Sequence, residues 1–393
     1  MDMIGTLVRQ ILQMFLLAFI GFVLFKTRKI SQEGSKTLGN LLIHLALPAV
    51  IINSFLVEYT PEHVTGILLS AAAALVLLPV SILIARLFFR KDAVAAFSGA
   101  FSNPGFFGIP LILASVGQGA VFYVACFIAF LNIGQWTYGV SILTGQSILS
   151  GFSPKKLIKA PFMIAILIGL FLFFSRIPLP GVITSCLSSV ASLNTPLAMF
   201  TVGIYLAQTD IPGMFRRKAN YAVSAVRLLI VPLVSVLLLA LLPESMHSMK
   251  MALLLAVACP VGSNVAVYAQ LYDRDYPYAV ETVVISTLFS LLTIPLVVSF
   301  ASLIWCGVLL HLLPCPAAGI FLFPCAEGFK KHLNSGITEG ILYSSPDPET
   351  DSSRGEDRVR PSSRAQRRPQ DGRTAVFRIT EIPASSGGTV PHH

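Results

Sequence analysis

The chain has few charged side chains for its length. Only 12% of its 393 residues are Asp, Glu, Lys or Arg, whereas 54% are hydrophobic. A soluble globular protein needs about 25% charged residues to keep its surface hydrated. The shortage therefore excludes an ordinary soluble domain and indicates that lipid is part of the solvent. It also excludes disorder over most of the length.

Signatures of the common enzyme and metal-binding classes are absent from the apolar part of the chain. It contains no HExxH or GxSxG motif, no paired carboxylates, and no Walker or GxGxxG loop for a nucleotide. The six cysteines form no CxxC pair, so we interpret them as small hydrophobic residues. We therefore expect a protein that is not an enzyme and that holds no cofactor or metal ion.

The net charge of +9 does not indicate nucleic-acid binding once the charges are located. Residues 1–304 carry 18 basic and 10 acidic side chains, and residues 305–393 carry the remaining 10 and 9. The basic excess of the first part lies in short loops between apolar runs, where Lys and Arg report membrane orientation. A lipid bilayer is therefore an expected partner, and a nucleic acid is not.

Continuous apolar runs are frequent, and they reach the length of a membrane-spanning helix, roughly 17 to 25 residues. Their continuity favours helices over a strand barrel, whose segments would alternate. The runs are residues 4–25, 38–57, 64–89, 94–116, 120–143, 157–175, 182–208, 219–242, 249–271 and 279–304. The sequence thus predicts an all-α membrane protein with ten transmembrane helices.

Lys and Arg are distributed unevenly over the loops between these runs. The loops after the odd-numbered runs carry fourteen, and the loops after the even-numbered runs carry only Arg176 and Lys250. Because basic loops stay in the cytoplasm, the odd loops are predicted inside and the N-terminus outside. Asp2 precedes the first run and a basic cluster at 26–29 follows it, the reverse of a cleavable signal peptide. We expect a multi-pass protein of the cell membrane, plasma or inner.

Two halves of five runs flank the longest loop of the bundle. We predict inverted repeats over residues 1–143 and 157–304, joined by a cytoplasmic linker at 144–156, because an odd number of spans reverses the second half. Prolines recur in the same order in both halves, Pro48 with Pro196 and Pro79 with Pro232. Chance placement is the alternative, since proline is common in membrane helices.

The residues from 305 to 393 differ from the rest. Their first part is apolar but interrupted by prolines, and Ser, Arg, Pro and Asp dominate from Glu327 onward. Such a composition predicts a mostly disordered tail. Three interpretations stay open: a tail translocated to the outside, an eleventh span or surface segment, and a product of a shifted reading frame.

The fourth and ninth runs are each interrupted near their middle. The fourth contains two prolines, two glycines and an amide between Asn103 and Pro110, and the ninth contains Pro260 and Gly262 before Asn264. A helix is broken at membrane depth only where protein or a water-filled cavity satisfies its backbone groups. If the breaks cross, half-helix N-termini bring partial positive charge to the midplane, which suits a carboxylate. The alternative is two kinked helices packed through small residues.

The string Asn103-x-Gly105-x-x-Gly108-Ile109-Pro110-Leu111, together with Pro260-x-x-x-Asn264 in the ninth run, resembles the auxin efflux carrier family, in particular its bacterial permease branch. The resemblance covers residues 1 to about 304. It implies a secondary transporter of small organic anions such as carboxylates, built from two five-helix inverted repeats with crossed, broken helices 4 and 9. The family's crossover asparagine falls on Asn103 and its second-repeat proline on Pro260. The large central loop of the plant carriers is missing, so plant-type phosphoregulation is not carried over.

The expected binding residues lie at the two breaks. They are Asn103, Pro104, Gly105, Gly108, Pro110, Pro260, Gly262, Ser263 and Asn264. Candidates to line the same cavity are His44, Asn53, Asn132, Gln135, Asn194 and Thr195. For each candidate the alternative is an interhelical hydrogen bond worth about 0.6 kcal/mol. Arg227 is expected to snorkel to the cytoplasmic interface, so that its replacement leaves anion affinity nearly intact.

Alternating-access transport of a small organic anion is the favoured function, and a homodimer is left open. One alternative is a sodium-coupled organic-anion symporter of the bile-acid type. Its weak point is that no carboxylate stands in the middle of any run, so ion coupling would use neutral oxygens or His44. The other is a non-transporting receptor or scaffold, favoured if the two breaks are packed solid.

Overall fold

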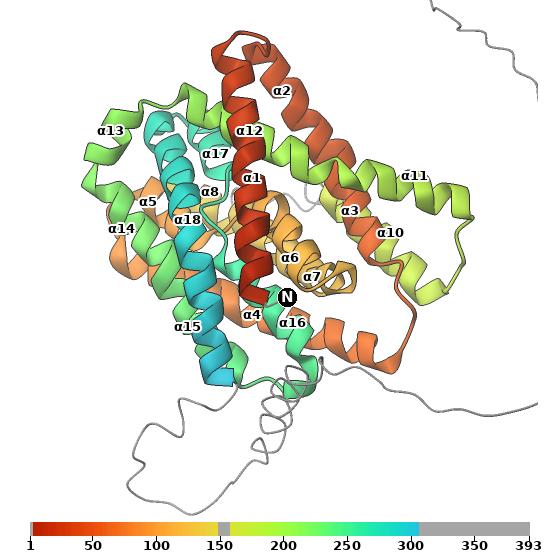
Figure 1. Ribbon diagram of the computed structural model, residues 1–393. Coiled ribbons are helices and arrows are strands. Elements are labelled where there is room, and N and C mark those ends of the chain that lie inside the picture. Colours follow the sequence, from red (N-terminus) through yellow and green to blue (C-terminus); the bar gives the residue numbers. More distant parts are fainter. Residues whose placement is uncertain (1–2, 148–157, 306–393) are drawn as a thin grey trace, which may run out of the picture. The chain divides into compact units, whose positions relative to one another are not determined.

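The computed structural model describes residues 3–147 and 158–305, and most of them form helices (Figure 1). Within these ranges no strand forms, although one isolated antiparallel bridge pairs Ser102 with Val261. The helical character predicted from the continuous apolar runs is therefore confirmed. The predicted tail beyond Trp305 and most of the predicted linker lie outside the described residues.

Each predicted run coincides with one or more helices. In residues 3–147 these are α1 Met3–Lys26, α2 Gln32–Leu41, α3 Leu47–Ser54, α4 Pro61–Phe88, α5 Ala93–Ala100, α6 Ile109–Ser115, α7 Gln118–Gly134 and α8 Val140–Thr144. In residues 158–305 they are α10 Pro161–Ser175, α11 Gly181–Ser192, α12 Asn194–Gln208, α13 Ile211–Arg216, α14 Lys218–Ala225, α15 Val231–Ala240, α16 His247–Ala258, α17 Asn264–Leu271 and α18 Tyr276–Trp305, with a short 3₁₀ turn at Glu244–Met246.

Wider π-helical turns join several of these helices into longer ones. The turns Leu42–Ala46, Pro104–Gly108 and Val226–Ile230 each end two residues before a proline, and a fourth turn is Gln135–Gly139. Proline lacks an N–H group and its ring clashes with the carbonyl four residues earlier, so the backbone widens there. Local sequence thus determines where the helices bulge.

Within residues 3–147 and 158–305, seven helical stretches are long and apolar enough to cross a membrane. The other predicted runs are also helical, but the stretches 93–115 and 247–271 are broken and Pro161–Ser175 is short. Large apolar side chains such as Leu16 and Phe19 are more than half exposed, as lipid-facing residues are. The chain is therefore a multi-pass membrane protein.

Small residues allow the helices to approach closely. α1 packs along α12, where a methyl group on Gly203 would overlap the carbonyl oxygen of Ala18. On the same pair of helices, a methyl group on Gly21 would lie 2.5 Å from the carbonyl oxygen of Phe200. Lipid offers no hydrophobic driving force between helices, so close packing of this kind holds the bundle together.

Candidate functional site

The breaks in the fourth and ninth runs lie side by side and pair with each other. The Asn103 N–H group donates a hydrogen bond to the Pro260 carbonyl oxygen (3.0 Å), and the Gly262 N–H group donates to the Phe101 carbonyl oxygen (2.9 Å). These bonds flank the Ser102–Val261 bridge, so the segment after α5 runs antiparallel to the segment after α16. Each break thereby satisfies backbone groups of the other, as an apolar surrounding requires. We call this pairing the crossover.

Proline and glycine explain why the chain unwinds here. Pro104 and Pro260 lack N–H groups and disfavour a helical conformation at the residue before them. A methyl group on Gly262 would lie 2.8 Å from the Ser102 carbonyl oxygen, and one on Gly108 would lie 2.9 Å from the Cys259 Sγ atom. The two segments can therefore approach this closely only because glycine, which has no side chain, occupies both positions.

Asn103 connects the two breaks through its side chain. Its Oδ1 atom accepts a hydrogen bond from the Phe106 N–H group (3.3 Å), which caps the helical stretch Pro104–Ser115. Its Nδ2 atom donates to the Ser263 Oγ atom (3.3 Å), the N-cap position of α17. Asn103, which was predicted as a binding residue, therefore lies at the centre of the crossover.

Two further polar side chains from the candidate cavity residues reach this region. The Gln135 Oε1 atom accepts from the Asn264 Nδ2 atom (2.8 Å), and the Asn194 Nδ2 atom donates to the Gly105 carbonyl oxygen (3.4 Å). Both residues are buried, and Gln135 Nε2 and Asn194 Oδ1 have no hydrogen-bond partner. A buried polar atom without a partner is costly, so these two atoms are available to a ligand or water.

The remaining expected residues are placed as follows. Pro104, Pro110, Pro260, Gly262 and Ser263 are buried, and Gly105 and Asn264 are half-buried. His44 is exposed, and its Nδ1 atom lies 3.1 Å from the Asn40 carbonyl oxygen. Asn132 donates to the Ile128 carbonyl oxygen of its own helix (2.8 Å), while Asn53 and Thr195 are half-buried. The structure therefore joins Gln135 and Asn194 to the crossover residues, and it gives His44 and Asn132 local partners only.

Arg227 does not snorkel, contrary to the sequence interpretation. It is 1% exposed, and its guanidinium donates to the carbonyl oxygens of Ala100 (3.0 Å), Gly99 (3.4 Å) and Val257. These carbonyls belong to the last turns of α5 and α16, directly before the crossover. Backbone carbonyls at two helix ends replace water around the charge, which removes the reason to snorkel. Arg227 lies eight residues after the start of the predicted eighth run, and this depth in the run already indicated burial.

Two other charged residues are also more buried than their positions near run ends suggested. Lys250 is 2% exposed, donates to the Leu242 carbonyl oxygen (3.3 Å) and lies over the Trp305 ring. Glu281 is 8% exposed, accepts a hydrogen bond from the Asn220 Nδ2 atom (3.0 Å) and forms an ion pair with the Arg217 Nε atom (3.2 Å). Both charges are held by partners rather than by bulk solvent.

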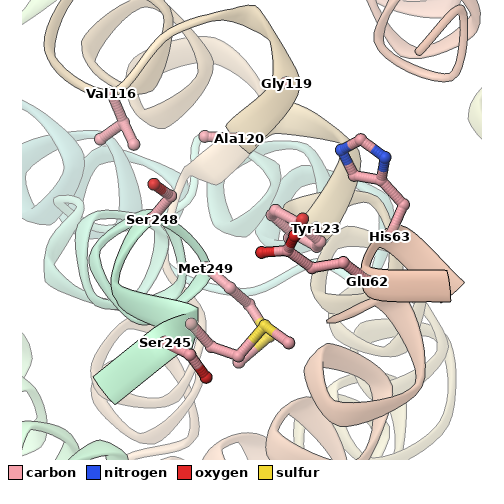
Figure 2. A pocket seen from close by; sticks show the side chains of 10 residues that line it. Glu62, His63, Val116, Gly119, Ala120, Tyr123, Ser245, Ser248 and Met249 are labelled. Atoms are coloured by element: carbon pink, nitrogen blue, oxygen red, sulfur yellow. The ribbon is translucent and has the colours of Figure 1, made fainter. Parts of the chain in front are cut away.

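A cavity of about 290 Å³ lies where α4, α7 and α16 begin (Figure 2). Glu62, His63 and Tyr123 line one side of it and Ser245, Ser248 and Met249 the other, as Figure 2 shows. A second cavity, of about 440 Å³, is lined by residues around the turn between α1 and α2, including Lys26 and Arg28. Neither cavity is lined by residues of the crossover. Sequence reasoning did not identify either one.

Broken helices that pair in the middle of a membrane bundle are typical of secondary transporters, whose substrate sites form at such breaks. The comparison with known proteins agrees with that class, because residues 6–298 match the family described as "Membrane transport protein". The chain therefore belongs to this family, the auxin efflux carrier family, as its motifs predicted. It is a membrane transport protein, and the family match gives no indication of an enzyme.

Two relatives belong to the same class. A protein of Rhizobium meliloti named "Putative malonate transporter" is 26% identical over 299 residues, covering 72% of this chain and 92% of the relative. A protein of Methanothermobacter thermautotrophicus named "Uncharacterized transporter" is 25% identical over 307 residues, covering 73% of this chain and 95% of the relative. The similarity thus extends over nearly the whole length of both relatives and over about three quarters of this chain.

Proposed function

We propose that this protein is a secondary transporter that moves small carboxylates across the cell membrane by alternating access. The observation that carries the proposal is the crossover, where the N-terminal ends of Pro104–Ser115 and α17 meet beside the Asn103 amide. Helix N-termini carry a partial positive charge, so the two ends together attract an anion without a lysine or arginine in direct contact.

A carboxylate has donors to bind at this position. The Asn103 Nδ2 atom donates over 3.3 Å to the Ser263 hydroxyl, a long bond that a charged oxygen would replace with a stronger one. The Gln135 side chain offers a further donor. Its Oε1 atom accepts from Asn264, while its Nε2 atom has no hydrogen-bond partner. Substrate binding would then exchange weak internal hydrogen bonds for charge-assisted ones.

The predicted orientation gives the first cavity a side of the membrane. With the N-terminus outside, the loops after even-numbered runs face outward, and the cavity bounded by Glu62 and Ser248 lies on that side. Ten spans arranged as inverted repeats, 1–143 and 157–304, would rock about the crossover to open it in turn to each side. The parallel order of prolines and of broken helices in the two halves supports this arrangement.

Dicarboxylates are the first substrates to test, since malonate appears in the name of the Rhizobium meliloti relative. Full-length protein in proteoliposomes loaded with unlabelled malonate should accumulate labelled malonate by counterflow, and empty liposomes should not. Succinate, benzoate and an auxin-like acid form the panel, and malonamide serves as the uncharged control. Absence of counterflow with every acid would overturn the transporter proposal and favour a receptor or scaffold.

The same assay separates the sodium-coupled alternative. Replacing sodium by potassium on both sides should leave malonate counterflow unchanged, because the middle of the spans offers no carboxylate ligand for sodium. A large loss of counterflow without sodium would instead favour the bile-acid type of symporter.

A further inference from the structure

Arg227 is placed by the π-helical turn Val226–Ile230, which precedes Pro232. From this turn one guanidinium contacts both half-helices that lead into the crossover. Nη1 donates to the Gly99 and Ala100 carbonyl oxygens at the end of α5, and Nη2 donates to the Val257 carbonyl oxygen at the end of α16. One side chain therefore binds the C-terminal ends of two helices that are far apart in the sequence.

Among the residues that the structure describes, no acidic side chain forms an ion pair with Arg227. Over the described residues, the ion pairs join Arg217 to Asp275 and Glu281, and none involves Arg227. The Arg227 Nε atom is buried and has no hydrogen-bond partner. A buried charge without a counterion is costly, so its retention requires a compensating interaction. The helix ends provide one.

The charges of the four helix ends show what this compensation achieves. Each helix C-terminus carries roughly −0.5 of an elementary charge and each N-terminus roughly +0.5. The two C-terminal ends of α5 and α16 would therefore cancel the two N-terminal ends across the crossover, leaving no net attraction for an anion. Arg227 supplies one positive charge where the two negative ends lie, so the positive ends are left uncancelled.

We propose that Arg227 sets the sign of the potential at the crossover and thereby makes the site selective for anions. It is a positioning and specificity-determining residue that acts through the helix ends rather than by direct contact with the substrate. The inference rests on the proposed carboxylate site at Asn103. Asn103 lies three residues beyond Ala100, so their Cα atoms are at most about 11 Å apart. At that range a unit charge changes the affinity for a monoanion by about tenfold, given an effective dielectric constant near 20.

The test compares charged and uncharged ligands on purified full-length variants in nanodiscs. Titration calorimetry gives the affinities for malonate and for malonamide, and their ratio is the measured quantity. Arg227→Gln should lower this ratio by about tenfold or more, because it removes the charge. Arg227→Lys should keep most of the ratio. Lys250→Gln is the matched control, since it removes another buried positive charge that lies roughly 10 Å farther along α16 than Val257, and it should lower the ratio by a smaller factor than Arg227→Gln does.

A second variant pair keeps the test decisive if Arg227→Gln does not fold. Cys259 is fully buried two residues after Val257, so Cys259→Asp would neutralise Arg227 without removing it. Cys259→Asp should lower the malonate-to-malonamide ratio by about tenfold, and Cys259→Asn should not. A purely structural role for Arg227 would lower both affinities together and leave the ratio unchanged in every variant.

The outcomes separate this inference from the proposed function. A wild-type protein that prefers malonate, with an unchanged ratio in Arg227→Gln and Cys259→Asp, would overturn the role of Arg227 and leave the transporter proposal standing. If the wild-type protein binds no acid of the counterflow panel better than its amide, both the role of Arg227 and the carboxylate site are overturned. This second result needs no variant, so the two outcomes are distinguishable.

Discussion

Asn103 makes two different hydrogen bonds with the two ends of its amide. Its oxygen accepts from the Phe106 N–H group and its nitrogen donates to the Ser263 hydroxyl. The first bond caps a helix and the second reaches across the crossover, so one side chain is both structural and available to a ligand. An aspartate could make the first bond but would repel a carboxylate, whereas an asparagine can make both.

Replacement of Asn103 by alanine should weaken anion binding by about ten- to a hundredfold, because a charge-assisted hydrogen bond is worth about 1.5 to 3 kcal/mol. Calorimetry with malonate measures this loss on the folded variant. Ser115→Ala is the control, because the Ser115 hydroxyl bonds only to the Leu111 carbonyl oxygen of the same half-helix (2.6 Å). Equal affinities in the wild type and Asn103→Ala would move the binding site away from the crossover.

At the scale of elements, the crossover depends on how closely two extended segments approach. Asn103 and Pro260 share one backbone hydrogen bond, and Phe101 and Gly262 share another. A side chain at Gly262 would separate the two segments, since its Cβ atom would lie 2.8 Å from the Ser102 carbonyl oxygen. The pairing of the two segments therefore requires glycine at position 262.

Gly262→Ala should cost about 1 to 3 kcal/mol of stability through overpacking and should reduce malonate counterflow strongly. Thermal unfolding in detergent and the counterflow rate measure the two effects. Gly39→Ala serves as the control: nothing lies within 4 Å of a Cβ atom there, and alanine favours the α2 helix. A Gly262→Ala protein with wild-type stability and transport would show that the close pairing is not needed.

At the scale of the whole molecule, the bundle has apolar helices throughout and basic residues in alternate loops. The asymmetry of fourteen against two predicts the orientation more firmly than any single loop does. Glu58 and Lys91 are exposed in successive loops, one before α4 and one after it. We therefore expect them to lie on opposite sides of the membrane.

Single cysteines at these positions test the orientation in a full-length background from which the six native cysteines have been removed. In intact cells, Glu58→Cys should react with a membrane-impermeant maleimide, and Lys91→Cys should react only after permeabilisation. The reverse pattern would place the N-terminus in the cytoplasm and would also reverse the side on which the Glu62 cavity opens.

Much of the architecture was determined by local sequence. Hydropathy accumulates along a run, and every apolar run predicted from it contains helix in the structure. Proline acts on its own backbone, so the breaks at Pro104 and Pro260 and the bulges before Pro48 and Pro232 lie where the sequence places them. The family could be identified for the same reason, because its motif is a string of such local features around Asn103.

Which side chains face each other was decided by the tertiary structure alone. Gln135 and Asn194 reach the crossover from two helices, and Arg227 reaches the helix ends directly before it from a third. The sequence assigned Arg227 to the cytoplasmic interface. In a soluble helix the polar face shows which side is buried, but helices that are apolar on all sides carry little such signal. The carbonyl groups that stabilise a buried charge come from other helices. The burial of Arg227 could therefore not be predicted from its own segment, because its partners are the C-terminal ends of α5 and α16.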